Sequence, residues 1–158
     1  MKNKLLSVSI PSNNKTDYLI ESINRFLDIK RNDEFEICIS DNANVSRLKI
    51  LRDSINEFDT KVNYSHNPKF SKMSQNFNNA INIANGDYVW LFGDDDIPSK
   101  NSIKIIKNAL NDHEVDLIIA NSSSYYDNNI IIEQQRVSST VDKFYDKKSN
   151  NDFMSELA

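Results

Sequence analysis

Three adjacent carboxylates, Asp94, Asp95 and Asp96, follow the apolar run 88–92 after a single glycine, Gly93. Like charges this close repel one another and raise one another's pKa, so an isolated cluster is costly. A divalent cation removes that cost, and carboxylate oxygens suit Mg²⁺ or Mn²⁺, which also take phosphate oxygens as ligands. Such a metal could hold a diphosphate and stabilise a departing nucleotide. The alternative is a solvated acidic turn, or a cap by Asp96 on a helix near Pro98.

Polar residues also follow two other apolar runs, 5–10 and 35–40, and these residues are Pro11, Ser12, Asn14, Asp41 and Asn42. An acidic side chain such as Asp41 can accept hydrogen bonds from a nucleoside, or it can form a local turn with Asn42. The chain lacks Gly-x-Gly-x-x-Gly after its first apolar run, which argues against a nicotinamide cofactor. It also lacks Gly-x-x-x-x-Gly-Lys-Ser/Thr, which argues against a P-loop.

Two lysines and one asparagine could contact a diphosphate near these clusters, namely Lys69, Lys72 and Asn76. The lysines can equally be plain surface residues that flank a helix. His66 and His113 lack the spacing of metal ligands, and we expect both on the surface.

These residues must be positioned by alternating strands and helices. Short apolar runs predict strands at 5–10, 35–40, 61–64, 88–92 and 115–120. We expect the first strand to stop at Pro11. Helical spacing of apolar residues predicts helices over about 16–27, 46–58, 70–84 and 98–110. After the last strand, 125–132 resembles a hairpin with its turn at 127–129.

The helix over 70–84 has the clearest pattern. Its apolar residues fall on one face, and they are Phe70, Met73, Phe77, Ala80, Ile81 and Ala84. The asparagines between them, Asn76, Asn78 and Asn79, are therefore expected to face mostly solvent, although Asn76 lies near the sheet edge. Gly86 is suited to the left-handed position after the helix.

This alternation predicts an α/β fold, a Rossmann-like, mostly parallel sheet with helices on both faces. Ligands bind such sheets at the carboxyl ends of the strands. The clusters at 11–14, 41–42 and 94–96 should therefore meet at one edge of the sheet.

The overall composition narrows the class of protein. The chain has 158 residues and a net charge of −4, so nothing suggests a basic surface for nucleic acid. Its apolar runs are too short for a signal peptide or a membrane span. We expect a cytoplasmic protein, with the inner face of the membrane as a second location.

Four stretches together resemble the inverting family 2 glycosyltransferases with a GT-A fold. They come in the family's order and spacing over about residues 4–120, and they are SVSIPS at 7–12, EICISDNA at 36–43, NFNNAI at 76–81 with ANGDY at 84–88, and WLFGDDD at 90–96. The last stretch resembles the branch that transfers sugars in bacterial surface polysaccharide synthesis.

The resemblance implies a nucleotide-sugar donor, commonly UDP-linked, a glycan or lipid-linked acceptor, and Mn²⁺ or Mg²⁺. It implies that Asp41 bonds the base and that Asp96 is the chief metal ligand. The expected nucleotide-sugar site consists of Pro11, Ser12, Asn14, Asp41, Asn42, Lys72, Asn76, Asp94 and Asp95. The expected metal ligands are Asp94 and Asp96.

By the same resemblance, residues 1–120 form the nucleotide-sugar-binding GT-A core, and residues 121–158 begin an incomplete acceptor-side region. The family's catalytic base is an Asp or Glu in the acceptor half. The carboxylates after residue 120 sit in no recognisable motif, so no catalytic base is assigned.

The leading hypothesis is a metal-dependent, inverting glycosyltransferase. The alternative is a catalytically incomplete nucleotide-binding or scaffolding module with the same fold. Apolar surface left by a missing half could produce a homodimer, and a missing C-terminal region could attach the protein to a membrane.

Overall fold

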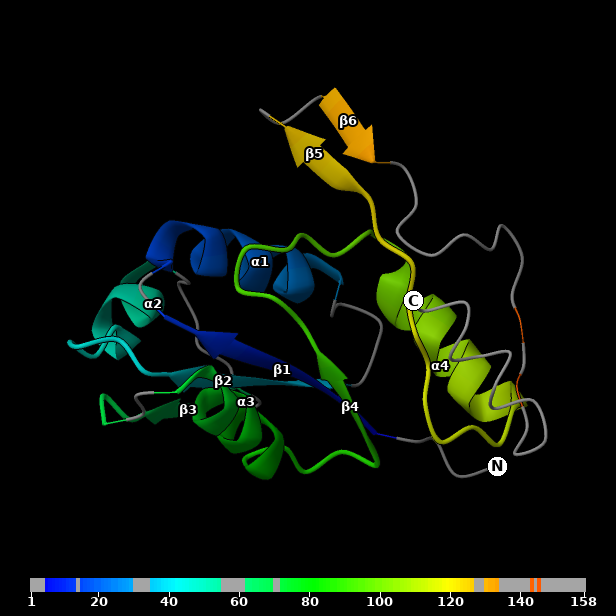
Figure 1. Ribbon diagram of the computed structural model, residues 1–158, viewed down its shortest axis with the longest axis horizontal. Helices are drawn as coiled ribbons and strands as arrows, with labels where there is room; N and C mark the ends of the chain where they lie inside the picture. The colour runs from blue at the N-terminus through cyan, green and yellow to red at the C-terminus, as the bar shows by residue number, and fades with distance from the viewer. Residues whose placement is uncertain are drawn as a thin grey trace. The chain divides into compact units, whose positions relative to one another are not determined.

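The computed structural model describes residues 5–13, 15–29, 35–54, 62–69, 72–126, 130–133, 143 and 145. Strands and helices alternate (Figure 1) in the order β1 (Leu6–Ser12), α1 (Thr16–Ile29), β2 (Phe35–Asp41), α2 (Leu48–Ser54), β3 (Val62–His66), α3 (Met73–Asn82), β4 (Tyr88–Leu91) and α4 (Ser102–Asp112). The strands β5 (Ser124–Tyr126) and β6 (Ile130–Glu133) follow. The chain divides into two compact units, Met1–Glu114 and Val115–Ala158.

The first unit contains a four-stranded sheet in the order β3-β2-β1-β4, and each neighbouring pair of strands is parallel. The predicted α/β fold with a parallel sheet is therefore confirmed. Ser12 at the end of β1 lies opposite Asp41 at the end of β2. This register brings two of the predicted clusters to the same edge.

Pro11 lies inside β1, so the expectation that it stops the strand is wrong. The carbonyl of Ser9 accepts a hydrogen bond from Phe92 on the β4 side, whereas the carbonyl of Ser12 accepts one from Asn42 on the β2 side. Because backbone groups alternate in direction along a strand, the nitrogen of Pro11 faces the β4 side. The β4 pairing ends at Ser9, so no hydrogen bond is lost to the missing N–H.

One face of the sheet is apolar. Side chains at alternate positions of β1 and β2 point to this face and are at most 1% exposed, and they are Leu6, Val8, Ile10, Phe35, Ile37 and Ile39. Helix α1 covers them with Leu19, Ile23 and Phe26, all fully buried. Phe26 packs edge-on against Phe35 and Trp90 at centroid distances of 6.0 Å. Burial of each large side chain contributes about 1.5–3 kcal/mol, so this face forms the core.

The opposite face is small and polar. It carries Ser7, Ser9, Glu36, Cys38 and Ser40, all of them buried. Helix α3 packs on this face against β1 and β2. Its buried side chains are Asn76 and Ala80.

This polar face overturns the expected orientation of α3. Asn76 is buried, whereas the apolar side chains of Met73, Phe77 and Ile81 are 72%, 36% and 40% exposed. The helix turns its asparagines toward the sheet because the sheet offers hydroxyl and carboxylate partners there. On β4, Val89 and Leu91 pair with Ser7 and Ser9 on the same face and are 37% and 43% exposed. The set of Met73, Phe77, Ile81, Val89 and Leu91 is called the apolar stripe below.

Glu36 ties the turn after α3 to this polar face. Its carboxylate accepts hydrogen bonds from Ser7 Oγ at 2.6 Å, from Asn63 Nδ2 at 3.1 Å, and from both the backbone and the side chain of Asn85. Gly86 donates its N–H to Ser7 Oγ at 2.8 Å. A Cβ on Gly86 would lie 2.5 Å from that oxygen, so the glycine is required for close approach. Its φ is not in the left-handed region, which corrects the reason expected for this glycine.

The predicted strand at 115–120 does not form. Its residues are described and lie in no strand, and Leu117, Ile118 and Ile119 are 65%, 37% and 44% exposed. A β-branched sequence becomes a strand only where a neighbour supplies hydrogen bonds and packing. The hairpin after it is confirmed as the antiparallel pair β5 and β6.

Several expectations fall outside the described residues, namely Ile55 to Phe58 at the end of the second predicted helix, Phe70 before α3, and the hairpin turn 127–129. Helix α4 begins at Ser102 rather than at Pro98.

We expect Glu36→Gln to lower the free energy of unfolding by about 1–3 kcal/mol at pH 7, because a charged acceptor of several buried hydrogen bonds is lost. Burial opposes ionisation of Glu36, but its hydrogen bonds from Ser7 and Asn85 prevail and hold its pKa below the usual range. The stabilisation is therefore complete above the unfolded-state pKa of about 4.3 and disappears as the pH falls through the lower folded-state pKa.

Urea unfolding at pH 7, 5 and 3.5 tests this prediction. The difference in stability between the native chain and Glu36→Gln should be full at pH 7 and narrow at pH 3.5. Glu21→Gln is the matched control, since Glu21 is exposed and pairs with Arg25 one helical turn away. A constant difference across this pH range would contradict the role assigned to the Glu36 carboxylate.

Candidate functional site

The three polar clusters meet at the carboxyl edge of the sheet. The backbone N–H of Asn42 donates to the carbonyl of Ser12 at 3.1 Å. Ser12 Oγ donates to Asp94 Oδ2 at 2.9 Å. The ends of β1, β2 and β4 are thus joined through side chains and backbone, as the parallel arrangement predicted.

Asp94 is the most buried carboxylate of the triplet, at 9% exposure. Its Oδ2 also accepts a hydrogen bond from the backbone N–H of Asn13 at 3.2 Å. Burial raises the pKa of Asp94, and the hydrogen bonds from Ser12 and Asn13 and the charge of Lys15 partly offset that rise. Because Asp94 holds the loop after β1, it has a structural role in addition to any ligand it binds.

Asp95 forms an ion pair with Lys15, a residue that the sequence did not single out. Lys15 Nζ contacts Asp95 Oδ2 and lies 3.9 Å from Asp94 Oδ1. The side chains of Lys15 and Asp95 are 48% and 50% exposed. The hydrogen bond to Asp95 and the charges of all three aspartates raise the pKa of Lys15. The sequence feature that could have indicated Lys15 is its position between the strand-end cluster at 11–14 and the start of α1.

Asp96 folds back onto Gly93. Its Oδ2 accepts the N–H of Gly93 at 3.2 Å, and its backbone carbonyl accepts a hydrogen bond from Ser22 Oγ on α1. A Cβ on Gly93 would lie 2.5 Å from Asp96 Oδ2. Glycine at position 93 therefore allows the compact turn that presents the triplet.

The carboxylate oxygens of the triplet can be compared with the ligands that a divalent cation requires. Within the described part of the chain, no group of three or more His, Cys, Asp or Glu side chains converges on one point. Asp94 and Asp96 use their Oδ2 atoms for the hydrogen bonds above. Their Oδ1 atoms could bind a cation, although Oδ1 of Asp94 already lies 3.9 Å from Lys15 Nζ. One or two carboxylates are enough for Mg²⁺ when phosphate oxygens complete its coordination. The residues therefore fit a metal that binds together with a diphosphate.

Asp41 is almost fully buried, at 1% exposure. Its Oδ1 accepts the N–H of Ala43 at 2.9 Å, which is the local Asx turn considered as the alternative. Its Oδ2 accepts the hydroxyl of Tyr64 at 2.6 Å. Burial and this hydrogen bond raise the pKa of Tyr64, so the phenol keeps its proton and remains a donor. Asp41 thus holds the loop after β2 through Oδ1 and is tied to β3 through Oδ2.

His66 also supports this loop, so its expected surface position is wrong. It is partly buried at the end of β3, opposite Asp41, and its Nε2 shares a hydrogen bond with the carbonyl of Ala43 at 2.8 Å. His113 is exposed, as expected. The sequence could not reveal the partners of Tyr64 and His66 because they depend on the register between β2 and β3.

Asn76 joins α3 to the strand ends. Its Nδ2 donates to the carbonyl of Ser12 at 3.0 Å, and its Oδ1 accepts the hydroxyl of Ser40 at 2.6 Å. Asn76 is 4% exposed, so it positions the edge from below. Of the other expected site residues, Pro11 is buried, Asn42 is partly exposed, Lys69 and Lys72 are exposed, and Asn14 lies outside the described residues.

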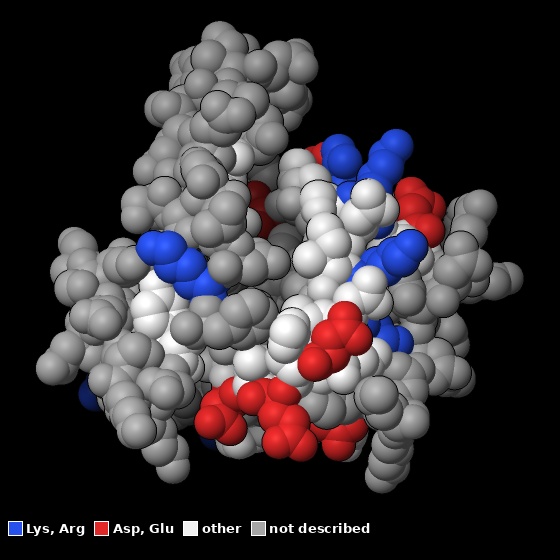
Figure 2. Space-filling view, turned by 90° about the vertical axis from the view of Figure 1, so that its right-hand side faces the viewer, with Lys and Arg blue, Asp and Glu red and all other residues white. Residues whose placement is uncertain are grey.

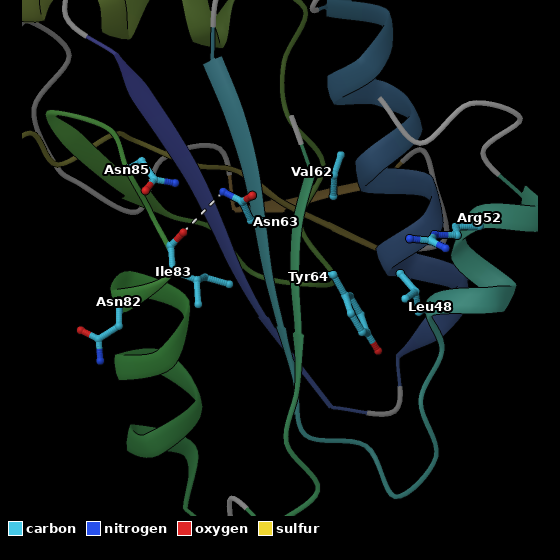
Figure 3. Close-up of a pocket in the computed structure, with 8 residues that line it drawn as sticks. All are labelled: Leu48, Arg52, Val62, Asn63, Tyr64, Asn82, Ile83 and Asn85. Carbon is cyan, nitrogen blue, oxygen red and sulfur yellow. Dashed lines mark hydrogen bonds between the residues drawn. The ribbon is translucent and has the colours of Figure 1, made fainter. Parts of the chain in front are cut away.

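A separate hollow of about 530 Å³ lies along β3 (Figure 3). It is lined by residues of α2, β3, the end of α3 and the α3–β4 turn, and the aspartate triplet does not line it. Asn63 points across it toward the carbonyl of Ile83, to which it donates a hydrogen bond at 3.4 Å. On the face drawn in Figure 2, basic and acidic side chains of the described residues both occur, so this face carries no uniform basic surface.

Comparison with known proteins identifies relatives of the chain. The family model described as Glycosyl transferase family 2 matches residues 7–156. The abequosyltransferase RfbV of Salmonella typhimurium is 34% identical over 117 residues, which are 73% of this chain and 35% of the relative. The glycosyltransferase GlyG of Streptococcus pneumoniae is 25% identical over 123 residues, which are 78% of this chain and 40% of the relative. The chain therefore spans well under half the length of these relatives.

A solved structure shares the fold. The crystal structure of S. aureus TarS 1-349 superposes with a TM-score of 0.57 at 22% identity, and the match covers 70% of this chain and 33% of that 1-349 chain.

We expect Tyr64→Phe to lower the free energy of unfolding by about 1–3 kcal/mol, because the buried carboxylate of Asp41 loses one of its donors. Chemical denaturation at pH 7 measures the effect. Tyr18→Phe is the control, since the side chain of Tyr18 is 59% exposed. Equal losses in the two variants would show that the hydroxyl of Tyr64 does not hold Asp41.

Proposed function

Because this chain belongs to glycosyltransferase family 2, we propose that the carboxyl edge of its sheet binds a nucleotide-sugar donor. The complete protein would transfer the sugar to a glycan or lipid-linked acceptor. We propose a UDP-linked donor on the basis of the motifs at 7–12, 36–43 and 90–96.

The observation that carries this proposal is the joining of three strand ends into one oxygen-rich edge. The hydrogen bond between Ser12 and Asp94 connects β1 to the triplet, and the one between Asn42 and Ser12 connects β2 to β1. Ligands of parallel sheets bind at this edge. The diphosphate of the donor would lie along Pro11 and Ser12, next to the triplet.

Family 2 transferases generally use a divalent cation. We propose Mn²⁺ or Mg²⁺ here, held by Asp96 and Asp94 together with the diphosphate. When bound, the cation would supply positive charge to the departing nucleotide. Lys72 at the start of α3 is exposed and could add a point charge.

We propose positioning roles for Asp41 and Asn76. Both are buried and hydrogen-bonded within the protein, so we propose that they shape the nucleoside pocket. For direct contacts to the nucleotide we propose partly exposed residues of this edge, such as Asn42.

We propose that transfer inverts the anomeric carbon. An acceptor hydroxyl would attack the sugar from the side opposite the nucleotide, and one carboxylate would remove its proton. That base is not assigned, and the candidates Asp142, Asp146, Asp152 and Glu156 lie outside the described residues. Membership in the family supports an enzyme over a non-catalytic module.

Self-association of this chain is a further part of the proposal. The apolar stripe on α3 and β4 is a surface that a second copy could cover, and a monomer in sedimentation experiments would contradict this. Within the described part of the chain, no helix has the length and apolar character to cross a bilayer. We propose that any attachment to the inner membrane face is peripheral.

We expect the chain to bind UDP in the presence of Mn²⁺, and Asp96→Ala to weaken that binding at least about tenfold, which corresponds to about 1.4 kcal/mol. Isothermal titration calorimetry measures both affinities. Asp53→Ala, an exposed position on α2, is the matched control and should bind as the native chain does. Absence of binding by the native chain, or equal binding by Asp96→Ala, would refute the proposed site.

A further inference from the structure

Lys15 places an ammonium group within the aspartate triplet. Its Nζ contacts Asp95 Oδ2 and lies 3.9 Å from Asp94 Oδ1. Lys15 precedes α1, and Asp95 lies 80 residues further along the chain after β4. The close approach of the two segments therefore results from the fold, not from neighbouring positions in the sequence.

The ammonium group of Lys15 lies against the same carboxylates that a divalent cation would approach. Asp94 Oδ1 is the oxygen of Asp94 that remains after Ser12 and Asn13 have bonded to Oδ2. A cation coordinated there would stand beside the positive charge of Lys15. Two positive charges a few ångströms apart repel each other even in a high-dielectric surrounding. A metal that binds without the diphosphate must therefore displace the Lys15 side chain or bind next to its positive charge.

The ion pair is also weak enough to be displaced. Both side chains are about half exposed, at 48% and 50%. An exposed ion pair of this kind typically changes a folding equilibrium constant by about fivefold or less. A diphosphate can coordinate the metal through its oxygens and pair with Lys15 through its negative charge. Water supplies ligands but no negative charge.

We propose that Lys15 makes divalent-cation binding at this edge conditional on the donor diphosphate. In the free chain, Lys15 serves as the counterion of Asp94 and Asp95 and keeps their affinity for a metal low. The diphosphate removes this restriction by adding ligands and negative charge to the site. Lys15 is thus a positioning residue that couples metal binding to donor binding. This inference rests on the proposed function, since it assumes that the edge receives a metal and a diphosphate.

The test measures binding of Mn²⁺ alone, without nucleotide, to the 158-residue chain. Electron paramagnetic resonance of free Mn²⁺ gives the affinity directly. Lys15→Met should bind Mn²⁺ about three- to tenfold more tightly than the native chain, because a nearby positive charge is removed. Lys15→Arg keeps the charge and should bind as the native chain does.

Two controls separate this effect from changes in folding or overall charge. Lys49→Met removes an exposed lysine on α2 and should leave Mn²⁺ binding unchanged. The helix start does not depend on the Lys15 side chain, since its backbone carbonyl accepts the N–H of Leu19 at 3.0 Å. Circular dichroism of Lys15→Met should therefore match that of the native chain, and its Tm should fall by a few degrees at most, as expected for the loss of an exposed ion pair.

The outcomes for the two hypotheses are distinct. Equal Mn²⁺ affinity of Lys15→Met and the native chain overturns the role of Lys15, even if the native chain binds UDP with Mn²⁺. Failure of the native chain to bind UDP with Mn²⁺ refutes the proposed donor site instead. Tighter binding by Lys15→Met but not by Lys15→Arg or Lys49→Met supports the inference.

Discussion

The hydrogen bond from Ser12 Oγ to the buried carboxylate of Asp94 connects segments that lie 82 residues apart. It requires that β1 and β4 end at the same edge, which the parallel pairing of the sheet provides. The same Asp94 oxygen holds the loop after β1 through Asn13. The position of the triplet relative to the other strand ends depends on this contact. A mutation that shortens or tilts either strand would therefore alter the site without touching the triplet.

The two faces of the sheet have different roles: one stabilises the fold, and the other positions the strand ends. The apolar face under α1 contains the largest buried side chains and accounts for the core. The polar face under α3 contributes hydrogen bonds, and Glu36 and Asn76 use them to set the α3–β4 turn and the strand ends. An unpaired buried polar group costs free energy, so each hydrogen bond of this network contributes to stability. This network therefore fixes the positions of the strand ends, and substitution of its residues is expected to be destabilising.

The sequence predicted the features that follow from local patterns. Apolar runs located β1 to β4 and helical spacing located α1, and the position of the triplet after β4 indicated the edge where the strand ends meet. Features that depend on register or on the opposite surface were missed. Met73, Phe77 and Ile81 matched a core pattern but are exposed, because the sheet face below α3 is polar. Tyr64 and Lys15 were missed because their partners come from other segments.

Paramagnetic broadening of backbone amide signals by Mn²⁺ in the presence of UDP tests the account most directly, since it locates the metal on the chain. The central claim is that the carboxyl edge holds the donor. It predicts that the signals of Asn13, Gly93 and Asp95 broaden strongly, while those of Val62 and Asn82 in the β3 hollow remain sharp. Strong broadening along the β3 hollow, with sharp signals at Gly93 and Asp95, would contradict it.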